Sequence, residues 1–371
     1  MALTAVPQQL SRSLADSEIQ QLLGLRVAKE MLGATKDGYS VEIGPLSMNY
    51  FSYTFSVKAN TTHGQRDVFV KIPKSDLRGA ARTILPISPE DRQMAQEEVF
   101  SLKLLGEKWA DDDQEVRWIA LCGVVPEYNA LVTDRVFADE TLLVFRRFDL
   151  LRRFGSCRNA QRLRHSMARI GTALQRFHRT STTTSVFRLS DEMPKFEFYC
   201  RELSTISGSA WPACIFRKLQ SMGDMQFASV VVPTLKGIDI RNVLIDALDR
   251  IYLLDPGKTK FTHPEADLAR FLMTYRILYW GSPLLLLLRK PDPKAEADFL
   301  AAYYANAQVS CPQLLSLFLL KEQLKHWHTA LDSLQRRPWP PILKRLAAWV
   351  YVNPFYARQV ARQYQSLTEL V

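Results

Sequence analysis

The sequence predicts an α+β protein of two lobes, with a small antiparallel sheet and one main helix ahead of a larger, mainly helical part. Residues 40–57 alternate apolar and polar side chains around the turn PLSMN, as the strands of a hairpin do. The β-branched run VFVKIP at 68–73 predicts a further strand, and EDRQMAQEEVFSLKLL at 90–105 has the apolar spacing of a helix. A chain of 371 residues is long enough for two such lobes.

The remaining elements follow from the same patterns. Residues 14–32 have helical periodicity, with apolar side chains at Ile19, Leu22, Leu23, Leu25, Val27 and Leu32. From Leu150 onward the pattern is mostly helical, apart from one hairpin and its flanks. We place the lobe boundary near Ala138, so that residues 1–138 form the smaller lobe and residues 139–371 the larger one.

Composition limits the environment and excludes some classes of protein. The chain is 47% hydrophobic and 23% charged, as an ordinary globular protein is. Its five cysteines form no CxxC pair, so neither a disulfide framework nor a zinc site is expected, and a reducing cytoplasm fits best. The N-terminus has no secretory pattern, and the longest apolar run, 283–288, is far shorter than the roughly 20 residues that span a bilayer.

Two metal-binding residue types flank the predicted hairpin. Apolar runs at 243–245 and 251–254 enclose a polar turn at 246–250, with Asn242 before the first run and Asp255 after the second. If the strands pair in register, Asn242 and Asp255 emerge together at the open end. Amide and carboxylate oxygens are ligands that Mg²⁺ takes.

A lysine and two glutamates stand upstream in a suggestive order. Lys71 lies between Val70 and Ile72 in the VFVKIP strand, and the helix that follows carries Glu97 and Glu98. Alternation along a strand turns Lys71 away from its apolar neighbours, and an unpaired buried lysine would be costly. We therefore expect an ion pair between Lys71 and one of these glutamates.

These motifs resemble the protein kinase-like superfamily, and in particular its aminoglycoside and choline phosphotransferases. The Asp-Pro-Gly at 255–257 is similar to the kinase Asp-Phe-Gly, Asn242 to the catalytic-loop Asn, and HPEADLARFL at 263–272 to the segment that follows the metal Asp. The resemblance covers roughly residues 40–330. It implies a two-lobed kinase-like fold, ATP and Mg²⁺ as cofactors, and magnesium ligation by Asn242 and Asp255.

The same resemblance assigns the nucleotide-binding residues. It implies that Lys71 binds phosphates and that Glu98, whose spacing to Leu102 and Leu105 fits relatives better than that of Glu97, is its partner. Adenine would lie against the backbone from Val132 through Asp134 to Val136. The turn with Ser47 would cover the phosphates, although the residues fit a plain hairpin turn equally well.

The catalytic loop departs from the family pattern. Relatives have His-Gly-Asp and four further residues before the Asn, whereas Gly237 stands five positions before Asn242 here, preceded by Leu235 and Lys236. The nearest carboxylate is Asp239. It either acts as the base from a shifted place, with Gly237 allowing the loop to turn, or braces the loop through Arg241 or Lys236. Asp267 matches a family Asp that braces this loop.

The net charge of +10 favours anionic partners, or it reflects a generally basic surface. An arginine-rich stretch at 146–169 is either a solvated helix face or a site for a phosphorylated substrate or membrane. In the C-terminal segment, Trp349, Tyr351 and other aromatics stand beside basic residues, as in a membrane or partner contact or in ordinary core packing. Nucleic acid is not expected.

We expect an ATP- and Mg²⁺-dependent phosphotransferase that acts on a hydroxyl of a small or lipid-linked, anionic, sugar-like acceptor. The alternative is a pseudokinase that binds nucleotide or a partner without catalysis. A third reading is a membrane-peripheral scaffold in surface-polysaccharide or lipid assembly. A cytoplasmic protein, peripheral to the membrane in the lipid-linked case, fits these readings.

Overall fold

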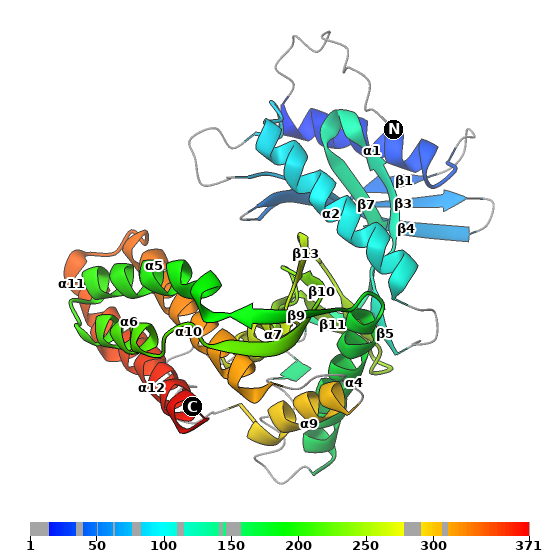
Figure 1. Cartoon of the computed structure of the whole chain (residues 1–371). Helices are drawn as coiled ribbons and strands as arrows, with labels where there is room; N and C mark the ends of the chain where they lie inside the picture. Colours follow the sequence, from blue (N-terminus) through cyan, green and yellow to red (C-terminus); the bar gives the residue numbers. More distant parts are fainter. Residues whose placement is uncertain are drawn as a thin grey trace. The chain divides into compact units, whose positions relative to one another are not determined.

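The computed structural model describes residues 15–34, 40–49, 51–61, 64–75, 83–109, 115–140, 144–145, 157–277, 291–305 and 311–370. The chain forms two compact units (Figure 1). The first comprises residues 1–139 and 244–259, and the second comprises residues 140–243 and 260–371. The expected α+β class is confirmed, with an antiparallel sheet in the first unit and mostly helices in the second.

The first unit is built on an antiparallel sheet of strand order β1-β3-β4-β7-β6, with β2 on β3. Its strands are β1 (Val41–Ile43), β2 (Ser47–Met48), β3 (Ser52–Thr61), β4 (Gly64–Pro73), β6 (Leu121–Val125) and β7 (Ala130–Asp134). A short 3₁₀ turn, η1 (Pro126–Tyr128), joins β6 to β7. Ser47 and Met48, expected in a turn, pair with Thr54 and Tyr53 of β3, so the turn is displaced to the residues after Met48.

A helix packs on each face of this sheet. Helix α1 (Asp16–Glu30) packs through Ile19, Leu23 and Val27 against Val70 and the other residues of β3, β4 and β7 that share its face. Leu22 and Leu25, also expected on the apolar face, are about half exposed.

Helix α2 (Pro89–Lys108) packs through Ala95 and Leu102 against Leu131, which faces the other way. It begins with a capping box between Ser88 and Asp91. Because neighbouring residues of a strand point to opposite faces, the α2 face also carries Lys71.

The hairpin predicted around residues 243–254 is confirmed. Strands β11 (Val243–Ile245) and β12 (Ile251–Leu253) are neighbours in a small sheet of order β5-β12-β11-β8, with β5 at Val116–Trp118 and β8 at Asp139–Glu140. Asp246 fixes the turn, since its carboxylate accepts hydrogen bonds from the backbone N–H groups of Leu248 and Arg250. Strand β12 pairs in parallel with β5. This pairing is why residues 244–259 belong to the first unit, whereas the expected boundary left them in the second part.

The second unit contains three strands and most of the helices. The helices are α4 (Cys157–Arg179), α5 (Leu189–Ser207), α6 (Trp211–Ser221), α7 (Glu265–Arg276), α9 (Pro293–Tyr304), α10 (Pro312–Gln335), α11 (Pro341–Ala347) and α12 (Asn353–Leu370). A π-helical turn, η3 (Ala348–Val352), joins α11 to α12. Helix α10 is the central element, with Phe318, Leu324 and Trp327 among its buried side chains.

The strands form a sheet of order β13-β10-β9, with β9 at Thr183–Arg188, β10 at Gln226–Leu235 and β13 at Thr259–Thr262. Strand β9 lies outside the hairpin and its flanks, where a mostly helical chain was expected. Its run TTSVFR is rich in β-branched residues, and it pairs antiparallel with β10.

Close packing in the second unit depends on one glycine. A side chain at Gly171 of α4 would collide with the backbone carbonyl of Phe299 on α9, so glycine permits these two helices to approach.

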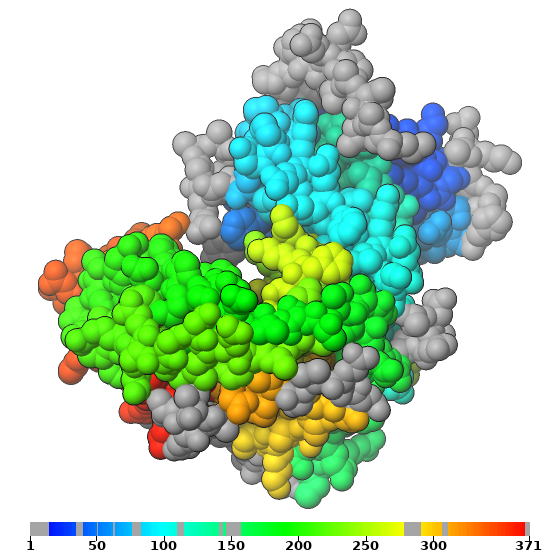
Figure 2. All heavy atoms as spheres, viewed as in Figure 1, coloured from blue at the N-terminus to red at the C-terminus, as the bar shows by residue number. Residues whose placement is uncertain are grey.

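In the space-filling view, atoms of the orange-red segment that includes α11 are visible at the left-hand edge of the molecule (Figure 2). None of the helices in the described ranges is long and apolar enough to cross a membrane. The apolar run at 283–288 lies outside those ranges.

Candidate functional site

Lys71 of β4 is the centre of a charged cluster in the first unit. Its Nζ lies 2.8 Å from Glu98 Oε1 and 3.0 Å from Asp255 Oδ1. The Lys71 and Glu98 side chains are only 19% and 10% exposed. Burial opposes the charged form of Lys71, but the two carboxylates outweigh it and raise its pKa. Lys71 is therefore a fixed positive charge between two carboxylates.

Helix α2 uses its two neighbouring glutamates differently. Glu98 points to Lys71, whereas Glu97 forms a short ion pair with Lys258 and accepts a hydrogen bond from Gln93. Residues about 100° apart around a helix cannot share one partner easily. One turn later, Ser101 Oγ accepts a hydrogen bond of 2.9 Å from the backbone N–H of Thr259. Helix α2 thus holds both Lys71 and the segment that follows Asp255.

Asp255 has an unusual backbone conformation. Its φ of 47° lies in the left-handed region, and Gly257, two residues later, has a φ of 62°. Asp is among the few side chains that enter this region readily, at a modest cost. The Asp255 side chain remains 49% exposed although Oδ1 contacts Lys71. The tight turn after β12 thus presents a carboxylate with one oxygen committed and the other accessible.

The register of the sheet places Ser47 on the same face as Lys71. Ser47 is opposite Thr54, and Thr54 is opposite Lys71. Directly opposed residues of antiparallel strands point to the same side, so these three form one cross-strand row. Ser47 is exposed, while Thr54 is buried between its neighbours. Sequence reasoning missed Thr54, because only the strand pairing reveals this row.

Val132 and Asp134 can act on the Lys71 face only through their backbone, whereas Thr133, opposite Phe69, has its side chain on that face. Val132 is buried on the α1 side, and Asp134 is opposite Val68 of the same face, where it accepts a hydrogen bond from Cys122 Sγ. The N–H of Asp134 donates to Ala120, whereas that of Val136 donates to no other group in the described part of the chain.

The loop that carries Asp239 and Asn242 belongs to the second unit and is anchored on α7. Asp267 Oδ2 accepts a hydrogen bond of 2.8 Å from the Leu235 N–H and lies 3.2 Å from Nε2 of His178. Thr274 Oγ1 accepts a further bond, from the Ile240 N–H. The bracing expected of Asp267 is therefore present in the structure.

Asp239 is engaged by Arg241. Its carboxylate accepts hydrogen bonds from the Arg241 backbone N–H and Nε, each 2.9 Å long, and a short one from the terminal guanidinium nitrogen. Asp239 also begins the 3₁₀ turn η2 (Ile240–Asn242) as its N-cap. Of the two orientations considered from the sequence, this is the one that braces the loop through Arg241. About four lone-pair sites are available on a carboxylate, so one site on Oδ2 remains.

Asn242 is fixed by a single bond that leaves its oxygen available. Its Nδ2 donates to the carbonyl of Gly237 at 2.9 Å, which directs Oδ1 elsewhere, and Oδ1 accepts no hydrogen bond from described residues. Gly237 is not among the described glycines with positive φ, so the loop does not turn here through the unusual angles that the sequence suggested.

The surroundings of this loop carry several charges from α7 and α10. Burial lowers the pKa of His326 to about 4, so its ring is neutral at pH 7. Burial opposes ionisation of Glu322, but Lys325 and Arg270 outweigh it and lower its pKa to about 2. The charge of Asp239 also acts on Lys325. With Arg241 and the bracing Asp267, three cations and three carboxylates surround the loop.

The arginine-rich stretch at 146–169 is described only in part. Its residues 146–156 lie outside the described ranges. Within α4, Arg164 pairs with the buried Asp292 at 3.3 Å and so joins α4 to the start of α9. This arginine is structural.

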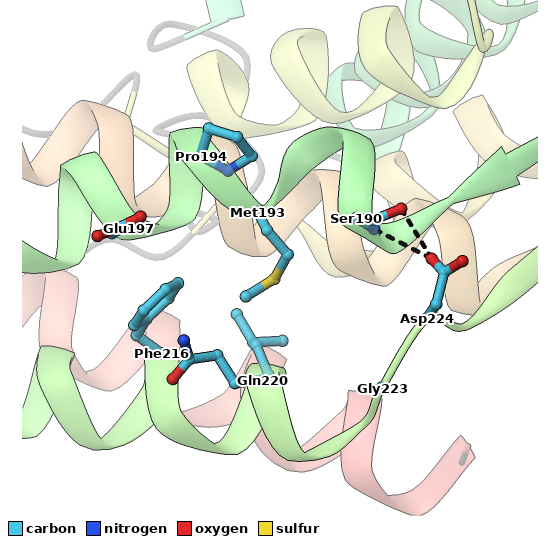
Figure 3. A pocket seen from close by; sticks show the side chains of 9 residues that line it. Ser190, Met193, Pro194, Glu197, Phe216, Gln220, Gly223 and Asp224 are labelled. Carbon is cyan, nitrogen blue, oxygen red and sulfur yellow. Dashed lines mark hydrogen bonds between the residues drawn. The ribbon is translucent and has the colours of Figure 1, made fainter.

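A groove of about 390 Å³ opens between α5 and α6 of the second unit. Met193 and Phe216 extend into it from facing helices, and Ser190 and Asp224 are hydrogen-bonded at one end (Figure 3). It contains none of the residues that the sequence singled out for catalysis or nucleotide binding.

No protein-family model matches the chain, and no curated protein matches its sequence. Solved structures do match its fold. An ADP-bound aminoglycoside phosphotransferase APH(2'')-Ib is 13% identical with a TM-score of 0.51, covering 95% of this chain and 98% of its own. A glucosamine kinase in complex with glucosamine, ADP and inorganic phosphate is 13% identical with a TM-score of 0.52, covering 97% and 84%.

A choline kinase from Cryptosporidium parvum Iowa II is 10% identical with a TM-score of 0.52, covering 94% of this chain and 96% of its own. The chain therefore has the protein kinase-like fold of the aminoglycoside phosphotransferase and choline kinase type, as the sequence resemblance implied. At these identities the likeness concerns the fold alone.

Proposed function

We propose that the protein is an ATP- and Mg²⁺-dependent phosphotransferase that acts on a hydroxyl group of a small or lipid-linked, anionic, sugar-like acceptor. The observation that carries the proposal is the double ion pair of Lys71 with Glu98 and Asp255. A partly buried lysine that is held by one carboxylate from helix α2 and another from the turn after β12 suits phosphate binding, since phosphoryl transfer depends mainly on positioning and charge stabilisation.

In this proposal the nucleotide lies along the α2 face of the sheet in the first unit. Lys71 neutralises phosphate charge, Glu98 fixes the ammonium group, and the Ser47 hydroxyl on the same face covers the phosphates. Adenine lies against the backbone from Val132 through Asp134 to Val136. Within the described residues the N–H of Val136 donates to no other group, so it is the donor that a ring nitrogen of adenine would use.

Asn242 and Asp255 are the proposed magnesium ligands, and their chemistry fits the ion. Asn242 keeps its side-chain oxygen free of hydrogen bonds in the described chain, and Asp255 keeps a half-exposed carboxylate. Mg²⁺ takes such hard oxygen ligands together with phosphate oxygens and water. When bound, the ion would neutralise charge on the transferring phosphate.

The proposed acceptor is anionic because the chain as a whole is basic, with a net charge of +10. Around the loop, Arg241, Arg270 and Lys325 stand beside the carboxylates of Asp239, Glu322 and Asp267. In the reaction, the acceptor oxygen bonds to the γ-phosphorus while the bond to the β–γ bridging oxygen breaks. The hydroxyl proton passes to the free site of Asp239 Oδ2 or to water.

The second candidate is a pseudokinase that binds nucleotide without turnover. The hydrogen bonds between Asp239 and Arg241 favour it. They occupy most of the acceptor sites of Asp239, which is the carboxylate within the loop itself. General-base help is typically worth about 10²–10⁴ in rate, so its loss would leave a slow enzyme or none.

Calorimetry with ATP in the presence and absence of Mg²⁺, followed by ³¹P detection of phosphorylated products in a metabolite extract, tests the proposal. Mg²⁺-dependent binding with a phosphorylated product supports the phosphotransferase, and binding without any product supports the pseudokinase. Absence of ATP binding at millimolar concentration would overturn both.

A further inference from the structure

The C-terminal part of the second unit exposes an apolar surface that no core within the described chain explains. Of the seventeen large apolar side chains that are most exposed in the described residues, six lie between positions 339 and 350. They are Trp339 (42%), Ile342 (77%), Leu343 (49%), Leu346 (51%), Trp349 (74%) and Val350 (58%). We refer to these six as the Trp339–Val350 face. Helix α11, which carries three of them, has no buried residue.

Helical spacing gathers these side chains on one side. Ile342, Leu346 and Trp349 follow one another at intervals of four and three, and Leu343 and Val350 are seven apart. The polar residues of α11 are Lys344 and Arg345, which border this stripe. The segment is thus amphipathic, with tryptophans on its apolar side and cations beside it.

The segment that carries the face is basic. From Ser333 to Thr368 the chain has no Asp or Glu but six basic residues: Arg336, Arg337, Lys344, Arg345, Arg358 and Arg362. One of them, Arg336, is paired with Asp332 at 3.0 Å. At the edge of the face, the guanidinium group of Arg337 lies 5.0 Å above the ring of Trp339. Lys344 and Arg345 belong to the same helix as Ile342, Leu343 and Leu346, so at least three cations, with Arg337, stand beside the exposed apolar side chains.

We propose that the Trp339–Val350 face docks on an anionic lipid surface. A bilayer interface accepts tryptophans and aliphatic side chains at the headgroup boundary, while Lys and Arg remain beside acidic headgroups. A second copy of the chain fits less well, because a two-fold contact would bring two identical basic rims together. The aromatic residues of the C-terminal segment have two different roles. Tyr356 is buried in the core of the unit, whereas Trp349 is exposed and available to the lipid surface.

The test uses the full chain and vesicles of zwitterionic lipid with and without about one-third anionic lipid. We expect flotation with the anionic vesicles only, reversed by salt, because each basic residue near such a surface contributes about fivefold in affinity. Ile342→Ser/Trp349→Ser should weaken binding by at least about tenfold. Lys344→Glu/Arg345→Glu should weaken it by at least about twentyfold.

Two control variants match these changes elsewhere on the molecule. Leu22→Ser/Leu25→Ser removes two exposed leucines from α1, and Lys103→Glu/Lys108→Glu makes the same charge change on α2. Both controls should bind as the wild type does, and unchanged melting temperatures show that each variant is folded.

Equal binding to neutral vesicles, or loss of binding in the controls alone, would overturn the proposal. So would a wild-type dimer in light scattering that Ile342→Ser/Trp349→Ser converts to monomer, since the face would then join two copies. These outcomes do not depend on catalysis. Failure of lipid binding would therefore leave the proposed phosphotransferase activity untouched, and failure of that activity would leave lipid binding untouched.

Discussion

The ammonium group of Lys71 lies 3.0 Å from the carboxylate of Asp255, although Lys71 belongs to strand β4 and Asp255 follows strand β12. The same ammonium group is 2.8 Å from Glu98. If phosphates and Mg²⁺ bind, Lys71 must exchange one carboxylate for a phosphate and Asp255 must exchange the lysine for the metal. We therefore expect the ion pair between Lys71 and Asp255 to belong to the nucleotide-free protein and to separate when ATP and Mg²⁺ bind. The variants below test this expectation.

Asp255→Ala should abolish the Mg²⁺-dependent part of ATP binding. In the wild type, ATP with Mg²⁺ should raise the melting temperature, because a ligand of the folded state stabilises it by mass action. The variant loses the proposed metal ligand, so its melting temperature should not respond. Thermal shift measurements with and without Mg²⁺ check this, and Glu107→Ala, an exposed change on α2, is the control that should keep the full shift.

Glu98→Gln should be far more damaging than Glu97→Gln. Glu98 is a nearly buried partner of Lys71, and removing its charge should lower the free energy of unfolding by about 1–3 kcal/mol, since Asp255 remains as a partner. The pair of Glu97 with Lys258 is more exposed, so its loss should cost less than about 1 kcal/mol. Urea titrations measure both values. Equal losses would contradict the special role of Glu98.

Asp239→Asn should show whether Asp239 acts as the general base or only holds the loop through Arg241. If Oδ2 takes the acceptor proton, turnover should fall by at least about 10²-fold with ATP affinity little changed. If Asp239 only holds Arg241, turnover should change little, and Arg241→Gln should instead loosen the loop and lower stability. Steady-state rates with the identified acceptor, together with calorimetry for ATP, give the comparison. Asp224→Asn in the same unit serves as the matched control.

Gly237→Asp should raise turnover, because it places a carboxylate five positions before Asn242, where the family that the sequence resembles is expected to have its base. Gly237 is not among the described residues with positive φ, so its backbone accepts a side chain without the strain of the left-handed region. The measurement is the rate of phosphorylated product formation at saturating ATP. Gly106→Asp, on an exposed position of α2, is the control. Gly223 is not used because its φ of 66° would strain any side chain. An unchanged rate in a folded Gly237→Asp variant would mean that the loop cannot aim a base from there.

Asp91 should make stability depend on pH in the acid range. Burial opposes its ionisation, but hydrogen bonds from Lys74 Nζ and from the backbone N–H groups of Ser75 and Ser88 outweigh it and lower its pKa from 3.8 to about 2. A lowered carboxyl pKa stabilises the fold above the unfolded value, and this stability, about 2 kcal/mol, is lost as the pH falls from about 4 to about 2.

Asp91→Asn should therefore lower the free energy of unfolding at pH 7 and flatten its decline between pH 4 and pH 2. Urea titrations across this range check the slope. Glu90→Gln, an exposed neighbour on the same helix, should leave the slope unchanged.

The sequence determined the elements whose pattern is local. The alternation around Lys71 gave the strand and its orientation, the apolar spacing gave helix α2, and the polar turn at 246–250 gave the hairpin. The order of these motifs was enough to predict the kinase-like fold, which the structural comparisons support. Strand β9 was missed, because its short β-branched run signals a strand only when β10 is available to pair with it.

Only the tertiary structure decided which side chains meet. The spacing of Glu98 to Leu102 and Leu105 predicted the partner of Lys71, and the ion pair confirms it, but the pairing of Glu97 with Lys258 is visible only in the folded chain. The row of Ser47, Thr54 and Lys71 depends on strand register, which no single strand encodes. The exposure of Trp349 likewise depends on how distant segments pack. Local patterns fix the conformation of a segment, but its partners follow from the packing of the whole unit.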